Sequence, residues 1–131
     1  MIIGFANGVF DLFHPGHRQF LTECRHHCEY LIVAVNSDAW VRQHKGEDRP
    51  VDELWKRMMH VRQLAEAVIP FDGYEEGLIV HIKPDVMFRG YDHSVDPYRG
   101  TAQVAKGIGC AIVQISHLPG HSTTELIHAA Q

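Results

Sequence analysis

One stretch decides the fold of this chain, Gly8-Val9-Phe10-Asp11-Leu12-Phe13-His14-Pro15-Gly16-His17, and it closely follows the apolar segment Ile2-Ile3-Gly4-Phe5-Ala6. The apolar segment has the composition of a buried strand. Pro15 suits the first position of a helix, because its φ is preset and it has no N–H to leave unpaired. His14 and His17 then lie at the first turn of that helix, where unpaired backbone N–H groups and the positive end of the helix dipole favour an anion. The stretch therefore predicts a phosphate site between a strand and a helix.

Composition limits what surrounds this turn. The chain has 131 residues, of which 45% are hydrophobic and 21% charged, so we expect one compact domain over residues 1–131. The net charge of −4 argues against a nucleic-acid surface. No apolar stretch reaches the roughly 18 residues of a membrane span, and no basic leader precedes the first strand. We expect a small-molecule partner, no nucleic acid, no membrane and a cytoplasmic location.

Apolar runs alternate with amphipathic stretches along the whole chain. Strands are predicted at 2–6, 30–35, 68–70, 85–88 and 111–115. Helices are predicted after Pro15, after the caps Ser37 and Asp52, at 77–82 and 101–108, and from Ser122 onward; the face of the helix after Asp52 would hold Leu54, Met58, Val61 and Ala65. This rhythm predicts an α/β fold: a single Rossmann-like three-layer domain with a five-stranded parallel sheet and ligands at the carboxyl ends of the strands.

The cysteines Cys24, Cys28 and Cys110 are odd in number and are expected to be reduced core thiols. A zinc site from Cys24, Cys28 and the neighbouring His26 and His27 is the alternative. Helical phase sends the cysteines inward and the histidines elsewhere, so we expect no metal held by protein ligands.

Polar residues follow the predicted strands. The groups are His14 with His17, Asn36-Ser37-Asp38, Arg89-Gly90-Tyr91-Asp92 and Gly120 to Thr124. Because the carboxyl ends of parallel strands share one edge, these groups are expected to converge on one cleft. A histidine near a helix start is more often a cap or a surface residue, so this convergence matters to the interpretation.

Two motifs resemble those of the cytidylyltransferase-like nucleotidyltransferases. Residues 8–17 are similar to the family's G-x-F-D-x-x-H-x-G-H signature, and Ser122-Thr123-Thr124 after Gly120 is similar to its C-terminal G-x-S-T-T segment. The resemblance covers essentially the whole chain. Its middle looks most like the adenylyltransferase domain that makes ADP-heptose, whereas its length is similar to glycerol-3-phosphate cytidylyltransferase. The middle segments that carry the likeness are 33–38, 41–46, 49–51, 57–58 and 83–86.

The resemblance implies transfer of a nucleotidyl group from a nucleoside triphosphate to the phosphate or phosphonate of a small acceptor, with release of pyrophosphate. The acceptor oxygen is already an anion near neutral pH, so alignment and charge stabilisation suffice without a general base. His14 and His17 would donate to the triphosphate, together with helix-terminal amides and a Mg²⁺ ion held mainly by phosphate oxygens. A homodimer is expected from the family.

The resemblance also assigns roles to residues of this sequence. Catalysis falls to His14, His17, Lys45 and Arg57. Nucleotide binding falls to Gly8, Val9, Phe10, His14, Gly16, His17, Arg89, Gly90, Asp92, Gly120, Ser122 and Thr123. Acceptor binding falls to Asp11, Lys45, Arg57 and Tyr91.

Each assignment has a plainer alternative. Lys45 lies with Arg42 and Arg49 around Gly46, which suits a phosphate-binding lid, but it could be a solvated loop charge. Arg57 could form a surface ion pair with a glutamate one turn earlier. Ser122 could serve only as a helix cap, although a cap leaves other donors for phosphate.

Departures from the family bear on the substrates. His117 replaces an arginine of the glycerol-3-phosphate enzymes, and Tyr91 interrupts the Gly-Gly-Asp run of the heptose enzymes. His93 and residues 94–100 match neither pattern and suit an acceptor-specific loop. Length and Tyr91 narrowly favour CTP with a small polyol phosphate or phosphonate, whereas the middle segments favour ATP with a sugar 1-phosphate. A non-catalytic nucleotide sensor on the same fold is the third hypothesis.

Overall fold

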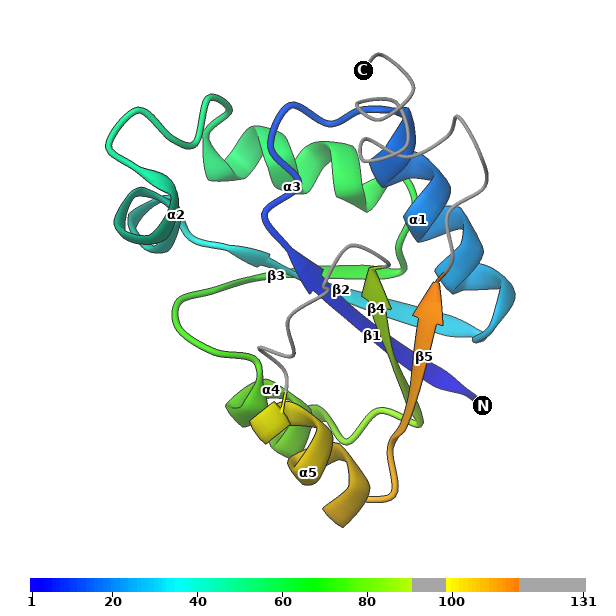
Figure 1. The fold of residues 1–131 in the computed structure, drawn as a ribbon. Helices are drawn as coiled ribbons and strands as arrows, with labels where there is room; N and C mark the ends of the chain where they lie inside the picture. Colours follow the sequence, from blue (N-terminus) through cyan, green and yellow to red (C-terminus); the bar gives the residue numbers. More distant parts are fainter. Residues whose placement is uncertain (91–98, 116–131) are drawn as a thin grey trace, which may run out of the picture.

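The structure is a computed structural model that describes residues 1–90 and 99–115 (Figure 1). Five strands and five helices alternate along this part of the chain. They are β1 (Ile3–Gly8), α1 (Pro15–His26), β2 (Tyr30–Asn36), α2 (Asp38–Lys45), α3 (Leu54–Arg62), β3 (Ala67–Phe71), α4 (Glu76–Ile82), β4 (Val86–Gly90), α5 (Arg99–Gly107) and β5 (Ala111–Ile115). None of these helices is long and apolar enough to cross a membrane.

The five strands form one sheet in the order β3-β2-β1-β4-β5, and every pairing is parallel. The predicted Rossmann-like α/β domain with a five-stranded parallel sheet is therefore confirmed. β1 lies at the centre, between β2 and β4, where the strand order reverses. In sheets of this kind ligands bind in the crevice outside the carboxyl ends of the strands at that reversal. The turn that follows β1 occupies this position.

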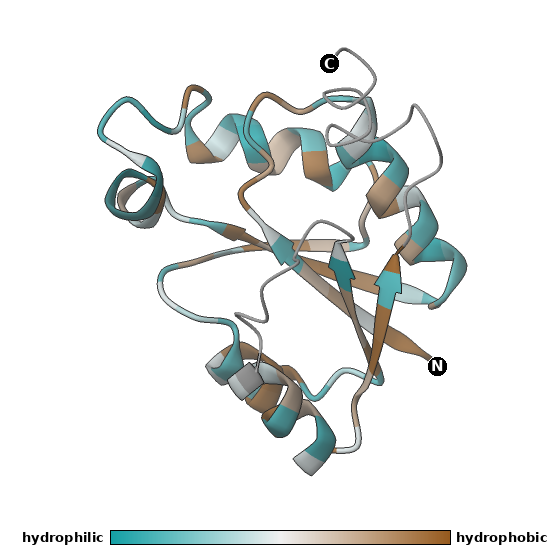
Figure 2. Cartoon of the chain, in the orientation of Figure 1, coloured by the Kyte–Doolittle hydropathy of each residue, from teal (hydrophilic) through white to brown (hydrophobic). Residues whose placement is uncertain are grey.

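Helices cover both faces of the sheet. Leu21 and Cys24 of α1 and Val61 of α3 pack with β2 residues on one face, while Ile79 of α4 and Ala105 of α5 pack on the other. Figure 1 shows α1 and α3 above the sheet and α4 and α5 below it. Figure 2 shows hydrophobic colours along much of the sheet and alternating colours along the helices, as buried parallel strands and amphipathic helices require.

Gly4 lets the central strand pack closely against its surroundings. A Cβ atom at this position would lie 2.7 Å from Cys28 Sγ and 2.7 Å from Phe88 Cε2. Cys24 is fully buried, Cys110 is buried and Cys28 is half-buried, and all three are free thiols. Burial raises the pKa of the Cys28 thiol, which is the state expected of an unreactive core residue.

The predicted cap at Asp52 is wrong. Glu53 precedes α3, its side chain caps nothing, and the helix ends at Arg62, so Ala65 lies beyond it. The backbone N–H of Asp52 instead donates to Asp11, and its carboxylate pairs with Lys56 at 3.5 Å. The helix α3 therefore begins without a side-chain cap. Elsewhere in the described residues the predicted elements are confirmed with ends shifted by one or two residues.

Candidate functional site

The turn between β1 and α1 begins the candidate site with a pair of reciprocal caps. His14 is the N-cap of α1, and its Nδ1 accepts the backbone N–H groups of Gly16 at 3.0 Å and His17 at 3.3 Å. Nδ1 of His17 accepts the backbone N–H of His14 at 3.4 Å. The two rings stack with their centroids 3.6 Å apart. Since each neutral ring uses Nδ1 as an acceptor, its proton lies on Nε2, which is then a hydrogen-bond donor.

Aromatic contacts hold the His17 ring in place. Phe10 meets it edge-on and Phe13 lies at a tilt, each with a centroid distance of 5.4 Å. Phe13 also stacks on His60 of α3 at 5.5 Å, with the planes 5° apart. The histidine pair is thereby packed against α3. His60 was missed by the sequence reasoning, because no local pattern links residues so far apart in the chain.

The backbone of the turn is unusual at two residues. Phe10 has φ of 55° and Leu12 has φ of 50°, a left-handed region that side chains larger than glycine seldom adopt. Gly8 makes room for this shape, because a Cβ atom there would lie 3.0 Å from the Phe10 ring. Strain of this kind persists only where the surroundings over-determine it, and it clusters at functional sites.

Asp11 supplies part of that constraint. Its side chain is 3% exposed, and its carboxylate accepts the backbone N–H groups of Leu12, Val51 and Asp52 at 3.0, 2.9 and 2.9 Å and Arg49 Nε at 3.2 Å. Burial by itself would raise the pKa of Asp11, but the backbone N–H groups of Asp52 and Val51 and the Arg49 guanidinium outweigh it and hold the pKa below its ordinary value. Asp11 therefore stays ionised and ties residues 49–52 to the turn.

Arg57 ties the same region together from α3. Its side chain is fully buried, which rules out the alternative of a surface pair with Glu53. Nε donates to the carbonyl of Asp52, Nη1 donates to the carbonyls of Val9 and Asn36, and Nη2 donates to Asp38 Oδ1 at 2.6 Å. The loops after β1 and β2 thus meet at one guanidinium. Asp38 is 31% exposed, so this ion pair is partly buried, and losing one partner costs less than the about 3–5 kcal/mol of a fully buried pair.

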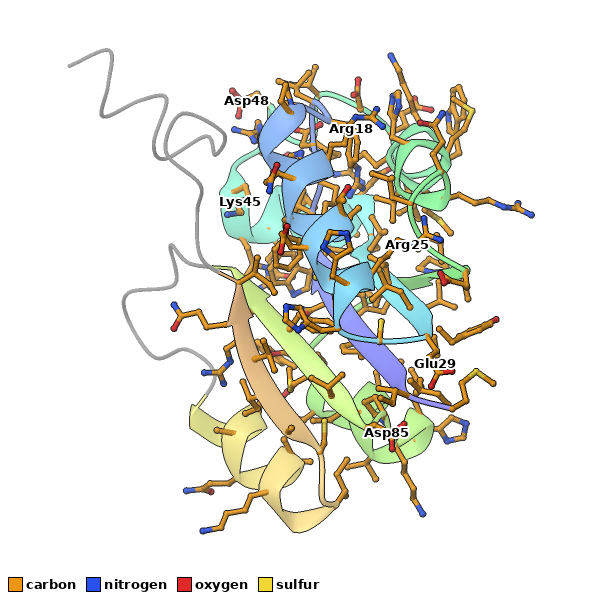
Figure 3. The ribbon with its side chains drawn as sticks, turned by 90° about the vertical axis from the view of Figure 1, so that its right-hand side faces the viewer. Arg18, Arg25, Glu29, Lys45, Asp48 and Asp85 are labelled. Atoms are coloured by element: carbon orange, nitrogen blue, oxygen red, sulfur yellow. The ribbon has the colours of Figure 1, made fainter. Side chains whose placement is uncertain are left out.

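Lys45 and Arg89 are the other two described cations assigned to the site, and they lie towards the carboxyl ends of α2 and β4. Lys45 is the exposed last residue of α2, followed by Gly46 with φ of 119°. Figure 3 shows Lys45 and Asp48 at the same end of the molecule as Arg18 of α1, opposite the end that carries Glu29 and Asp85. Arg89 and Gly90 are half-buried at the carboxyl end of β4.

The remaining site predictions lie outside the described residues. They are Tyr91, Asp92, Gly120, Ser122 and Thr123. Among the described residues, the structure brings His14, His17, Asp11 and Arg57 into one connected region. No group of three or more His, Cys, Asp or Glu residues in 1–90 and 99–115 is arranged to hold a metal ion.

Known proteins resemble the chain over nearly its whole length. A family model described as cytidylyltransferase-like matches residues 5–129. The chain belongs to this family. The bifunctional protein HldE of Rhodopseudomonas palustris strain BisA53 is 44% identical over 133 residues, which cover 98% of this chain and 27% of HldE. HldE of Bradyrhizobium diazoefficiens is 41% identical over 98% of the chain and 26% of its own length. The chain thus spans about a quarter of these relatives.

Solved structures agree with the fold. The lipopolysaccharide core biosynthesis protein of Thermoplasma volcanium has a TM-score of 0.75 and 29% identity, covering 90% of this chain and 98% of its own. Pantothenate synthetase of Thermus thermophilus has a TM-score of 0.60 at 10% identity, covering 90% of this chain and 56% of its own, and is a likeness of fold alone. The family and the HldE relatives indicate a nucleotidyltransferase enzyme.

The caps predict a pH dependence. Burial lowers the pKa of His14 from its ordinary value of 6.5, so below that value the unfolded chain binds a proton before the folded chain does. The free energy of unfolding should therefore fall as the pH drops below 6.5. The fall should end where His14 also protonates in the folded state and can no longer accept at Nδ1. Urea unfolding measured across this pH range should show the loss. His14→Asn, which caps without titrating, should show a smaller loss; an equal loss in both proteins would contradict the assignment.

Proposed function

We propose that this domain transfers an adenylyl group from ATP to the phosphate of a heptose-type sugar 1-phosphate and releases pyrophosphate. The observation that carries the transfer chemistry is the pair of Nε2 donors of His14 and His17 at the N-terminus of α1, beside the reversal of strand order. The choice of ATP and a heptose phosphate rests on the HldE relatives.

The chemistry needs alignment more than proton transfer. An oxygen of the acceptor phosphate attacks the α-phosphorus in line, the new O–P bond forms, and the bond to the β-phosphate oxygen breaks with its electrons leaving on pyrophosphate. The attacking oxygen is already ionised. The backbone N–H groups of Gly16 and His17 are already accepted by His14, so the Nε2–H donors and the positive end of the α1 dipole stabilise the charge that builds on the triphosphate. His14 and His17 are the catalytic residues of this proposal.

Mg²⁺ fits the proposal as a partner of the nucleotide. Asp11, the buried carboxylate of the turn, already accepts four hydrogen bonds, so it is not a good ligand. An ion held mainly by triphosphate oxygens suits both this arrangement and the reluctance of Mg²⁺ to lose its water. When bound, it would neutralise charge on the leaving pyrophosphate.

The relatives favour the adenylyltransferase over the sequence-based preference for CTP and a polyol phosphate. That preference rested on chain length and on Tyr91. Length is a weak criterion here, because the chain spans about a quarter of the HldE proteins that it resembles. Tyr91 lies outside the described residues. The lipopolysaccharide core biosynthesis protein with the same fold supports a sugar acceptor.

The expected homodimer stays a proposal. Trp55 and Met59 of α3 are 62% and 50% exposed and line an apolar groove beside the edge strand β3. Arg62 and Glu66 line the same groove. Opposite charges on one face suit pairing with a second copy around a two-fold axis, because each then meets its complement. Light scattering measures this directly.

Substrate choice is tested by pyrophosphate release. ATP with a heptose 1-phosphate should give sustained release, whereas CTP with glycerol 3-phosphate should give little. His17→Ala should lower kcat about 10²–10³-fold through the loss of one donor to the developing charge. Nucleotide binding without release from any pair would identify a sensor and refute the proposed transfer.

Lys45 is tested by a substitution that leaves the core intact. Lys45→Ala should raise KM for ATP or for the acceptor about tenfold, because it removes the exposed charge that the proposal assigns to phosphate binding. The melting temperature should not change. Lys106→Ala, which removes an exposed lysine from α5 on the other face of the sheet, is the matched control. Wild-type KM values for both substrates in the Lys45 variant would exclude the lid role.

A further inference from the structure

The side chains of Asp11 and Arg57 use most of their hydrogen-bonding capacity within the protein. The Asp11 carboxylate accepts four hydrogen bonds, which is about the full capacity of a carboxylate. Arg57 makes four hydrogen bonds with its five N–H donors and has no exposed surface. These bonds leave little of either side chain for the acceptor binding that the family resemblance implies.

Both residues instead converge on one segment of the chain. Asp11 holds the backbone N–H groups of Val51 and Asp52, and Arg57 holds the carbonyl of Asp52. The segment 46–53, which links Lys45 of α2 to α3, is therefore fixed to the turn after β1 from both sides.

The same bonds reach the strained part of the turn. Asp11 lies between Phe10 and Leu12, the two residues with positive φ, and Arg57 holds the carbonyl of Val9 directly before them. Two residues after Leu12 the chain reaches His14, whose ring and backbone form the caps with His17. The turn that carries the histidine pair is thus held by bonds from two buried side chains.

We infer that Asp11 and Arg57 are positioning residues, a latch that holds the turn 9–14 and the segment 46–53 together so that the histidine pair and Lys45 act on one triphosphate. This inference rests on the proposed function for its kinetic consequence. The structural claim, that these two side chains hold the turn and the segment together, does not depend on the proposed function. A latch affects turnover with every acceptor, whereas an acceptor-binding residue affects the affinity for the acceptor.

Asp11→Asn is the central test. The amide would present an NH₂ group to N–H donors of the segment 49–52, so part of the latch opens while the shape of the side chain is kept. We expect faster hydrogen exchange at the Val51 and Asp52 amides, altered imidazole ¹⁵N shifts of His14 and His17, a kcat about 10²-fold lower, and an acceptor KM within about twofold of wild type. Asp48→Asn, an exposed acid in the same segment, is the matched control and should match wild type in all four measurements.

The opposite pattern overturns the inference. If Asp11 contacts the acceptor, Asp11→Asn will raise the acceptor KM and leave the amide exchange and the imidazole shifts unchanged. Arg57→Lys also distinguishes a positioning role from an acceptor contact, because it keeps the charge but loses the fork of donors. A positioning role predicts a low kcat and shifted imidazole signals. An acceptor contact predicts that the remaining charge keeps part of the affinity for the acceptor.

Two safeguards keep the test decisive. Should Asp11→Asn not fold, Arg49→Gln removes only the half-exposed donor at 3.2 Å, and the latch then predicts a smaller change of the same kind, in exchange and in kcat with acceptor KM unchanged. Should the wild-type protein release no pyrophosphate, the proposed function fails, yet amide exchange and the imidazole spectra still decide whether the latch exists.

Discussion

Two Nδ1 atoms accept backbone N–H groups at the start of α1, and the orientation of both site histidines follows from these bonds. His14 accepts from Gly16 and His17, and His17 accepts from His14. This arrangement sets the proton on Nε2 of each neutral ring and stacks the rings at 3.6 Å. Reciprocal capping by two side chains is a common way to begin a helix. Here both capping side chains are imidazoles, and accepting at Nδ1 makes Nε2 of each ring a hydrogen-bond donor. The same caps that begin the helix therefore also provide donors suited to phosphate oxygens.

The fold places the histidine pair at the edge of the parallel sheet where ligands bind. β1 is the central strand, and its carboxyl end lies where the strand order reverses. The loop after β2 and the segment before α3 approach the same turn, and Arg57 and Asp11 bond to them. Positive φ at Phe10 and Leu12 is tolerated because these bonds and the packing of Phe10 over Gly8 offset its cost.

Sequence patterns predict the sheet correctly, because strands buried on both faces are continuously apolar and each helix between them carries one apolar face. They also foresaw the histidine turn, since Pro15 marks a helix start and the residues follow a buried strand. They do not predict that the side chain of Arg57 is buried and bonded to other segments of the chain. Helical spacing offered only a local partner, whereas its actual partners come from Val9, Asn36, Asp38 and Asp52. The start of α3 also depends on a distant residue: Asp11 holds the backbone N–H of Asp52, and the helix begins one residue later than predicted, without a side-chain cap.

The central claim is that the paired histidines grip the triphosphate. A crystal structure with a non-hydrolysable ATP analogue and Mg²⁺ tests it most directly. The account predicts phosphate oxygens within about 2.7–3.2 Å of Nε2 of both His14 and His17. A triphosphate bound elsewhere, with neither ring in contact, would contradict it.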